Sequence, residues 1–190
     1  MILDLSLPIE EEMPFYPGDP KPQVRKFLSI PKDEYDVSEI IIGTHTGTHI
    51  DVPAHTIPNG KTVDEIDISS FIGNGKACGK NELELDTEVL LIYTGTNKRW
   101  RKGWNMENIE TIDENLANKI VKKEIRIVGI DSPSIGSIDV HKILLLNNVI
   151  VVENLSDKLS YLIGKRFEFY AIPLLINKGD GAPARAFAKL

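Results

Sequence analysis

The stretch THTGTHIDVPAH, residues 44–55, contains three of the chain's four histidines together with an aspartate. Gly47, three threonines and Pro53 all oppose an α-helix at this point. The residues that lead into it, SEIIIGT (38–44), are rich in β-branched side chains and are typical of a strand. We therefore predict an extended or irregular path through the stretch.

The polar residues of this stretch share one parity. Side chains two residues apart lie on the same face of an extended chain, so His45, His49, Asp51 and His55 would point the same way. Gly47 permits a tight bend that would bring the first two histidines together. Two imidazoles and a carboxylate with an open position are a common ligand set for a catalytic divalent metal. Surface or hydrogen-bonded core histidines are the alternative, but four polar residues of one parity favour the metal site.

The fourth histidine, His141, lies one turn into a helix that we expect to begin near Ile138. The strand that follows, VIVVE (149–153), ends in Glu153. A helix that leaves one end of a sheet and a strand that returns to it would bring these two side chains to the same end. A buried acidic residue is unfavourable unless it is paired or bound to a cation, so both residues are candidate ligands. A satisfied core histidine and an exposed strand end are the alternatives.

Composition limits the class of protein. The chain has 190 residues, of which 42% are hydrophobic and 26% charged, and we predict a single domain over residues 1–190. The net charge of −6 argues against a nucleic-acid partner, and the basic segment NKRWRKGW (97–104) is interpreted as a solvated loop. Cys78 is the only cysteine, which favours a reducing compartment. The sequence lacks a long apolar run and a secretory signal, so we expect a cytoplasmic protein without a membrane partner.

The pattern of apolar residues predicts an α/β or mixed layered domain, in which helices flank a mixed sheet. Short apolar runs are expected to form strands covered on both faces: SEIIIGT, VLLIY (89–93), IRIVGI (125–130), VIVVE and FEFYAI (167–172). The alternating Leu3, Leu5 and Leu7 indicate a half-buried strand. An apolar stripe predicts a helix over residues 106–123. A second helix is predicted over 138–146 with Ser137 as its N-cap, and a shorter one from Ser156 to Gly164.

Several segments carry a resemblance to a known family. HTGTHIDVPAH resembles the HxGTHxDxPxH signature of the metal-dependent cyclase family, whose best-known members are bacterial kynurenine formamidases. FYPGDP (15–20), VGIDSPSI (128–135), the spacing from His141 to Glu153 and GDGAPARA (179–186) resemble further family segments, so the match covers most of the chain. Asp131, Ser134 and Arg185 also resemble family positions, without an assigned role.

The resemblance implies a ligand set and a fold. One divalent metal would be bound by His45, His49 and Asp51, and Asp51 would bridge to a second metal on His141 and Glu153. His55 would be the acid/base residue. Isatin hydrolases of the family carry glutamine at the Glu153 position and are built for one metal, so Glu153 favours two ions. Zinc is expected, with manganese as the alternative. The implied fold is a swivelling β/β/α domain assembled into homodimers or homotetramers.

The resemblance also implies an activity, the hydrolysis of N-formyl-L-kynurenine to L-kynurenine and formate in tryptophan catabolism. Phe15 and Tyr16 are candidate contacts to the substrate ring, and Trp100 and Trp104 could stack on it or simply pack in their loop. The formamidases carry tryptophan where this chain has Tyr16, which leaves room for another small-molecule substrate. A cyclic amide, a lactone or a small ester, as in an isatin hydrolase, is the first alternative. A non-catalytic metal-dependent binding protein is the second.

Overall fold

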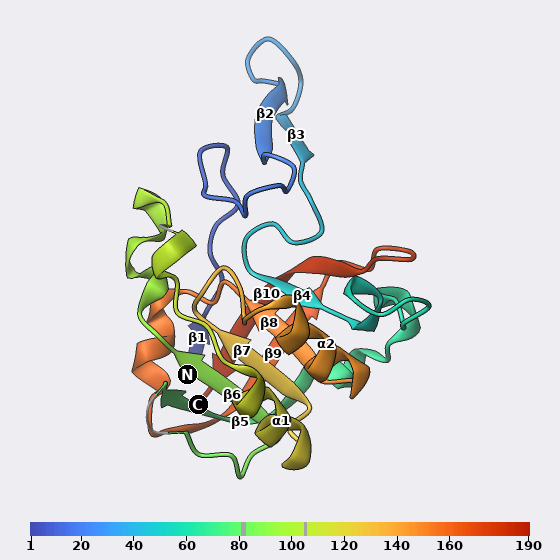
Figure 1. The fold of residues 1–190 in the computed structure, drawn as a ribbon. Helices are drawn as coiled ribbons and strands as arrows, with labels where there is room; N and C mark the ends of the chain where they lie inside the picture. Colours follow the sequence, from blue (N-terminus) through green and yellow to red (C-terminus); the bar gives the residue numbers. More distant parts are fainter. Residues whose placement is uncertain (81–82, 105) are drawn as a thin grey trace.

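The structure is a computed structural model that describes residues 1–80, 83–104 and 106–190. Within these residues, eight strands form one mixed sheet in the order β1-β10-β4-β8-β7-β6-β5-β9. Strand β9 also pairs with β10, so the seven strands from β10 to β9 close into a barrel (Figure 1). The sheet strands are β1 (Ile2–Asp4), β4 (His49–Asp51), β5 (Ile72–Gly79), β6 (Val89–Tyr93), β7 (Ile127–Ile130), β8 (Ile150–Glu153), β9 (Arg166–Pro173) and β10 (Gly181–Lys189). This closed mixed barrel with flanking helices confirms the predicted fold class.

The parallel part of the barrel is buried on both faces. Strands β5, β6, β7 and β8 run parallel, and all other pairings in the sheet are antiparallel. Leu91 on β6 and Val152 on β8 belong to the core inside the barrel, whereas their neighbours Leu90 and Val151 pack towards the helices. Two-sided burial explains why these strands are continuously apolar, and the prediction is confirmed for β6, β7 and β8.

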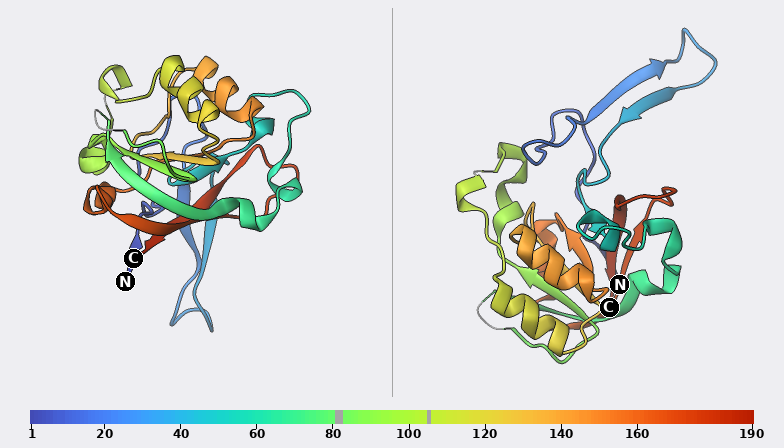
Figure 2. Two further views of the ribbon diagram at one scale, coloured as in Figure 1. Left: turned by 90° about the horizontal axis from the view of Figure 1, so that it is seen from below. Right: turned by 45° about the vertical axis from the view of Figure 1, so that its right-hand side comes forward.

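Two helices cover one side of the barrel, as Figure 2 shows. Helix α2 (Ile138–Leu146) has the predicted bounds, and the Ser137 side chain accepts a hydrogen bond from the backbone N–H of Val140 as its N-cap. Helix α1 (Glu114–Lys122) lies beside α2 and buries Ala117 and Ile120. Among the described residues, none of the helices combines the length and apolarity that a bilayer crossing requires.

The helix predicted over residues 106–123 is wrong in its first half. Only a 3₁₀ turn, Met106–Asn108, forms there. The backbone N–H of Ile112 donates to the carbonyl of Ile135 at 2.8 Å, which ties the segment to the loop after β7. The Asp113 side chain then accepts from the N–H of Leu116 and starts α1 one residue later.

Other short 3₁₀ helices occupy the connections. The segment after Ser156 is also of this type and spans Asp157–Leu162, followed by Gly164 with a φ of +74°. The remaining ones are Pro53–His55, Val63–Glu65, Ile68–Phe71 and Thr96–Lys102.

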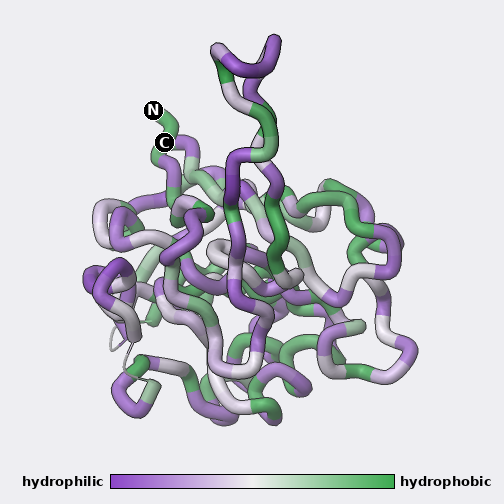
Figure 3. Tube along the Cα trace, turned by 90° about the horizontal axis from the view of Figure 1, so that it is seen from above, coloured by the Kyte–Doolittle hydropathy of each residue, from purple (hydrophilic) through white to green (hydrophobic). Residues whose placement is uncertain are grey.

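A two-stranded arm projects from the barrel. Strands β2 (Gln23–Leu28) and β3 (Val37–Ile41) pair with each other and stand away from the body in Figures 1 and 2. The strand predicted from SEIIIGT is therefore present, but its predicted burial on both faces is wrong. Ile40 and Ile41 are 57% and 45% exposed, because the main packing partner of each arm strand within the described chain is the other arm strand. Figure 3 shows hydrophobic residues along this exposed ribbon.

Candidate metal centre

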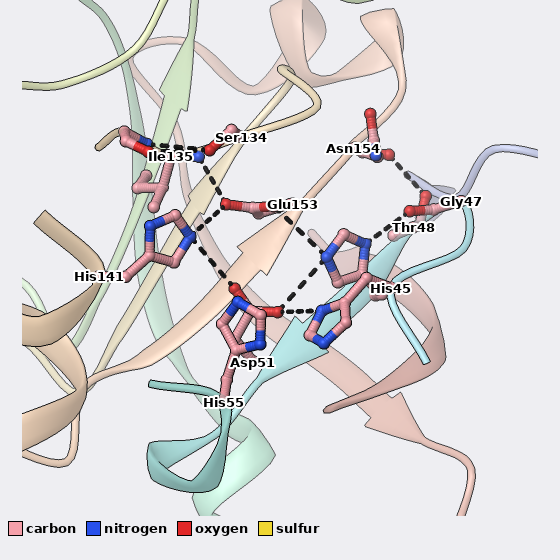
Figure 4. A network of polar contacts seen from close by, with 12 residues as sticks. His45, Gly47, Thr48, Asp51, His55, Ser134, Ile135, His141, Glu153 and Asn154 are labelled. Atoms are coloured by element: carbon pink, nitrogen blue, oxygen red, sulfur yellow. Dashed lines mark hydrogen bonds and ion pairs between the residues drawn. The ribbon is translucent and has the colours of Figure 1, made fainter. Parts of the chain in front are cut away.

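All six residues singled out in the sequence as ligands or acid/base lie at one end of the barrel. His49 and Asp51 are on β4, and Glu153 ends the neighbouring strand β8, directly opposite His49 in the antiparallel register. His141 reaches the same point from α2. His45 arrives from the turn before β4, in which Gly47 has a φ of +67°, and His55 from the 3₁₀ helix after it. Figure 4 shows the resulting network of polar contacts.

Asp51 is at the centre of the cluster and almost completely buried. Its Oδ1 lies 2.8 Å from Nδ1 of His45 and 3.4 Å from Nε2 of His49. Its Oδ2 lies 3.6 Å from Nε2 of His141 and has no hydrogen-bond partner among the described residues. A buried carboxylate oxygen without a partner is strongly unfavourable, which is the situation that a bound cation relieves.

The orientation of two histidines is fixed from behind by backbone carbonyls. Nδ1 of His49 donates to the carbonyl of Gly47 at 2.8 Å, and Nδ1 of His141 donates to that of Ser137 at 3.0 Å. A carbonyl oxygen can only accept, so these nitrogens carry the ring protons and the Nε2 atoms are free to bind. Both Nε2 atoms face Glu153, at 3.4 and 3.1 Å. Lone pairs that face a carboxylate require a proton or a metal between them.

The charged side chains of the cluster influence one another's pKa values strongly. Burial opposes the imidazolium form, but hydrogen bonds to the carboxylates outweigh it and raise the pKa of His45 and of His141 to about 9. The pKa of His49 is raised well above its usual value for the same reason. Burial likewise opposes ionisation of Asp51, yet the adjacent histidines hold its pKa well below the usual range. The metal-free cluster therefore holds protons, and a metal would have to displace them.

The donor set fits divalent metals that take nitrogen and oxygen ligands. Ligand atoms of His45, His49 and Asp51 lie within 4.8 Å of one another. The same is true of Asp51, His55 and His141. A third group joins His45, His55 and Asp180 in the same way. Asp51 belongs to the first two groups: its Oδ1 faces His45 and His49, and its Oδ2 faces His141.

A pocket of about 270 Å³ opens onto the cluster. Phe15, Tyr16 and Trp104 form part of its wall, and His55 and Ser134 also line it. The two aromatic residues predicted as substrate contacts are thus beside the cluster.

Trp100 is placed elsewhere. It is buried against Leu7 and Met13, so of the two tryptophans only Trp104 reaches the pocket.

Two residues with a family resemblance lie outside the pocket wall. The Asp131 carboxylate accepts hydrogen bonds from the N–H groups of Thr94 and Gly95 at 2.5 and 2.8 Å, and burial raises its pKa to about 6. It shapes the loop after β6. Arg185 on β10 forms an ion pair with Asp4 on β1 at 2.7 Å, and this pair attaches the edge strand β1 to β10.

Asp180 contacts His45 of the cluster, although the sequence predicted no role for it. It precedes β10 and its Oδ2 lies 2.8 Å from Nε2 of His45. The sequence offered one signal, the GDGAPARA segment, but no spacing connects this residue to histidines more than a hundred positions earlier.

The closed barrel and its histidine–carboxylate cluster define the class of protein: a barrel with a buried cluster suited to a divalent metal, onto which a pocket opens. Comparison with known proteins supports this class. The profile of the Cyclase family, described as "Putative cyclase", matches residues 3–79. A kynurenine formamidase from Geobacillus thermodenitrificans is 32% identical over 97% of this chain and 95% of its own length. The chain belongs to the cyclase family that includes the bacterial kynurenine formamidases.

Further relatives span the whole chain. An uncharacterised protein of Methanocaldococcus jannaschii is 37% identical over 92% of both chains. A solved structure described as a potential metal-dependent hydrolase with cyclase activity is 27% identical, with a TM-score of 0.80, and covers 99% of this chain and 96% of the other. An isatin hydrolase bound to the product analogue thioisatinate has a TM-score of 0.83 at 19% identity, covering 98% and 91%, and shares the fold.

Proposed function

We propose that the protein is a metal-dependent hydrolase that cleaves N-formyl-L-kynurenine to L-kynurenine and formate in tryptophan catabolism. The observation that carries the proposal is Asp51, a buried carboxylate whose Oδ1 faces His45 and His49 and whose Oδ2 faces His141, below an aromatic-walled pocket. The relationship to a kynurenine formamidase at 32% identity over nearly the full chain supports the choice of substrate. The location proposed is the cytoplasm, since a chain with one cysteine forms no internal disulfide.

The metal ligands proposed are the five residues of the cluster other than His55. One ion would be held by His45, His49 and Asp51, and a second by Asp51, His141 and Glu153. Zinc is the proposed metal, with manganese as the alternative, because imidazole and carboxylate ligands suit both. When bound, the ions supply a coordinated water with a pKa near 7 and an electrophile that polarises the substrate carbonyl.

His55 is the proposed acid/base residue. Hydrolysis forms a bond from the water oxygen to the formyl carbon and breaks the bond from that carbon to the arylamine nitrogen, which must leave with a proton. His55 is partly exposed, lines the pocket and has its ring centroid 4.1 Å from that of His45 and 5.7 Å from that of His141. An imidazole at this position has a ring nitrogen that can take the proton of the water and deliver one to the amine.

The pocket wall supports an aromatic substrate. Phe15, Tyr16 and Trp104 present rings around an opening that is large enough for one aromatic amide. The indole N–H of Trp104 donates to the Asn97 side chain at 2.9 Å, and this holds the ring in place.

Hydrolysis of formylkynurenine by the zinc-loaded protein tests the proposal, with isatin, a lactone and a simple ester as comparison substrates. The proposal expects formylkynurenine to have the highest kcat/KM. A higher kcat/KM for the cyclic amide or the lactone would instead support an activity like that of an isatin hydrolase. No turnover of any substrate in the panel would favour a non-catalytic binding protein.

A homodimer or homotetramer is part of the proposal. The projecting arm exposes Phe27 at 67%, Ile30 and Tyr35 at 59% each and Ile40 at 57%, and apolar surface of this kind favours association between copies. Light scattering after gel filtration should give a multiple of 21.2 kDa. The variant Phe27→Asp should shift the protein towards the monomer, and a monomeric wild-type protein would refute this part.

A further inference from the structure

Asp180 lies against the cluster but is not among the proposed metal ligands. It occupies the last position before β10, and its backbone carbonyl accepts a hydrogen bond from the N–H of Val52 at 3.3 Å. Val52 directly follows Asp51 in the chain. This bond therefore holds the loop of Asp180 against the strand that carries the centre of the cluster.

One oxygen of Asp180 contacts two histidines. Oδ2 lies 2.8 Å from Nε2 of His45 and 3.4 Å from Nδ1 of His55. The two rings are neighbours, with centroids 4.1 Å apart and planes inclined by 45°. A carboxylate oxygen accepts more than one hydrogen bond, so Asp180 can receive the ring protons of both histidines.

These contacts specify which nitrogen of each ring carries a proton. Nδ1 of His45 lies 2.8 Å from Asp51 and therefore faces the proposed metal. The opposite nitrogen, Nε2, faces Asp180 and must carry the ring proton when Nδ1 is a ligand. In the same way, a proton on Nδ1 of His55 towards Asp180 leaves its Nε2 free for the chemistry of the pocket. A carboxylate behind a metal-binding imidazole typically fixes its tautomer and increases its basicity.

We propose that Asp180 is a positioning residue that selects the Nε2–H tautomer of His45 and the Nδ1–H tautomer of His55. The inference rests on the proposed metal site and adds a residue to it. In this proposal Asp180 acts through the two histidines. Its carboxylate and their ring nitrogens lie within 4.8 Å of one another, so a ligand role is the alternative that the ion count tests.

Zinc binding and ring-nitrogen NMR of three proteins test the inference: wild type, Asp180→Ala and Asp180→Asn. Competition with a chromogenic chelator should show zinc binding 10- to 100-fold weaker in the alanine variant. The asparagine variant should recover part of this loss, because its side-chain oxygen still accepts a hydrogen bond. All three proteins should bind the same number of ions. In the zinc-loaded wild type, nitrogen–proton correlations should show His45 protonated at Nε2, and this proton should exchange faster in the alanine variant.

The matched control is Asp64→Ala. Asp64 accepts a hydrogen bond from the backbone N–H of Lys178 at 2.8 Å, so it supports the same loop without touching a histidine. Its variant should bind zinc like the wild type. If it reproduces the loss seen for Asp180→Ala, loop support explains the effect and the proposal is overturned. Undiminished zinc affinity in Asp180→Ala would also overturn it, and a lower ion count would make Asp180 a ligand instead.

The readouts separate this inference from the proposed function. Zinc affinity and tautomer need no substrate, so a protein without formylkynurenine turnover still tests Asp180. With both proteins saturated with zinc, Asp180→Ala should lower kcat with little change in KM, since the pocket wall is unaltered. A wild-type chain that binds no zinc would end both proposals.

Discussion

Replacement of Glu153 by glutamine should remove one of two metal ions and leave the fold intact. Oε1 of Glu153 accepts the backbone N–H of Ile135 at 2.5 Å, and a glutamine oxygen can keep this bond. The uncharged amide nitrogen would then replace Oε2, which lies 3.4 Å from Nε2 of His49. What is lost is the negative charge beside His141, on which the second ion depends. The variant Glu153→Gln should therefore bind one zinc ion and the wild type two.

The size of the effect follows from mass action. Each site with free zinc at 100 times its dissociation constant adds about 2.7 kcal/mol to stability. In a chain of this size, about 1 kcal/mol corresponds to about 2–4 °C in Tm. Loss of one site should therefore reduce the zinc-induced rise in Tm by about 5–10 °C, roughly half of the wild-type rise.

Calorimetric titration and thermal denaturation with and without zinc measure both quantities. Glu168→Gln is a suitable control, because it removes a carboxylate that contacts Lys189 and Tyr170 on β10 and β9 and no member of the cluster among the described residues. It should bind zinc like the wild type. Two equivalents of zinc bound by Glu153→Gln, or a full rise in Tm, would refute the assignment of Glu153 to the second ion.

Three further predictions concern the acid/base residue, pH and the pocket wall. His55→Ala should keep the zinc stoichiometry while kcat falls about 10²- to 10⁴-fold, and wild-type turnover would exclude the acid/base role. The pKa of about 9 for His141, raised from 6.5, contributes stability that is present below pH 6.5 and lost as pH rises through 9. The Tm of the metal-free protein should therefore fall across this window while that of the zinc-loaded protein does not, and parallel pH profiles would contradict this. Trp104→Ala should raise KM about 5- to 10-fold, or about 1–1.4 kcal/mol, with a smaller effect on kcat, and an unchanged KM would remove Trp104 from the substrate contacts.

The sequence predicted the centre of the cluster better than the path of the chain. The parity argument holds for His49 and Asp51, which share a face of β4. It does not describe His45 and His55, because the chain turns at Gly47 and enters a 3₁₀ helix at Pro53. These residues meet because the chain bends on both sides of a three-residue strand.

Two strands that close the barrel carry no usual strand signal. β5 contains three glycines, Gly73, Gly75 and Gly79. A Cβ at Gly75 would lie only 2.6 Å from the Phe167 ring on β9. The close approach of β5 and β9 therefore requires glycine, which weakens the local pattern. β10 pairs with β1, β4 and β9 along its length and buries Ala182, Ala186 and Ala188 in the core inside the barrel, so small side chains replace the usual β-branched ones. Such strands are determined by tertiary packing.

The burial of the arm and the role of Asp180 depend on contacts remote in sequence. The apolar run in β3 has the composition of a core strand, and composition alone does not specify whether the same chain covers it. Asp180 and His55 are 125 positions apart, and only the pairing of β10 with β4 brings them together. A pattern within one segment contains no information about such a contact.

The most direct test is the rate of formylkynurenine hydrolysis measured before chelation, after complete removal of metal, and after addition of zinc. The cluster around Asp51 predicts loss of activity in the metal-free protein and its return with about two equivalents of zinc per chain. An undiminished rate in the metal-free protein, or no uptake of a divalent ion, would contradict the central claim that these histidines and carboxylates form a catalytic metal centre.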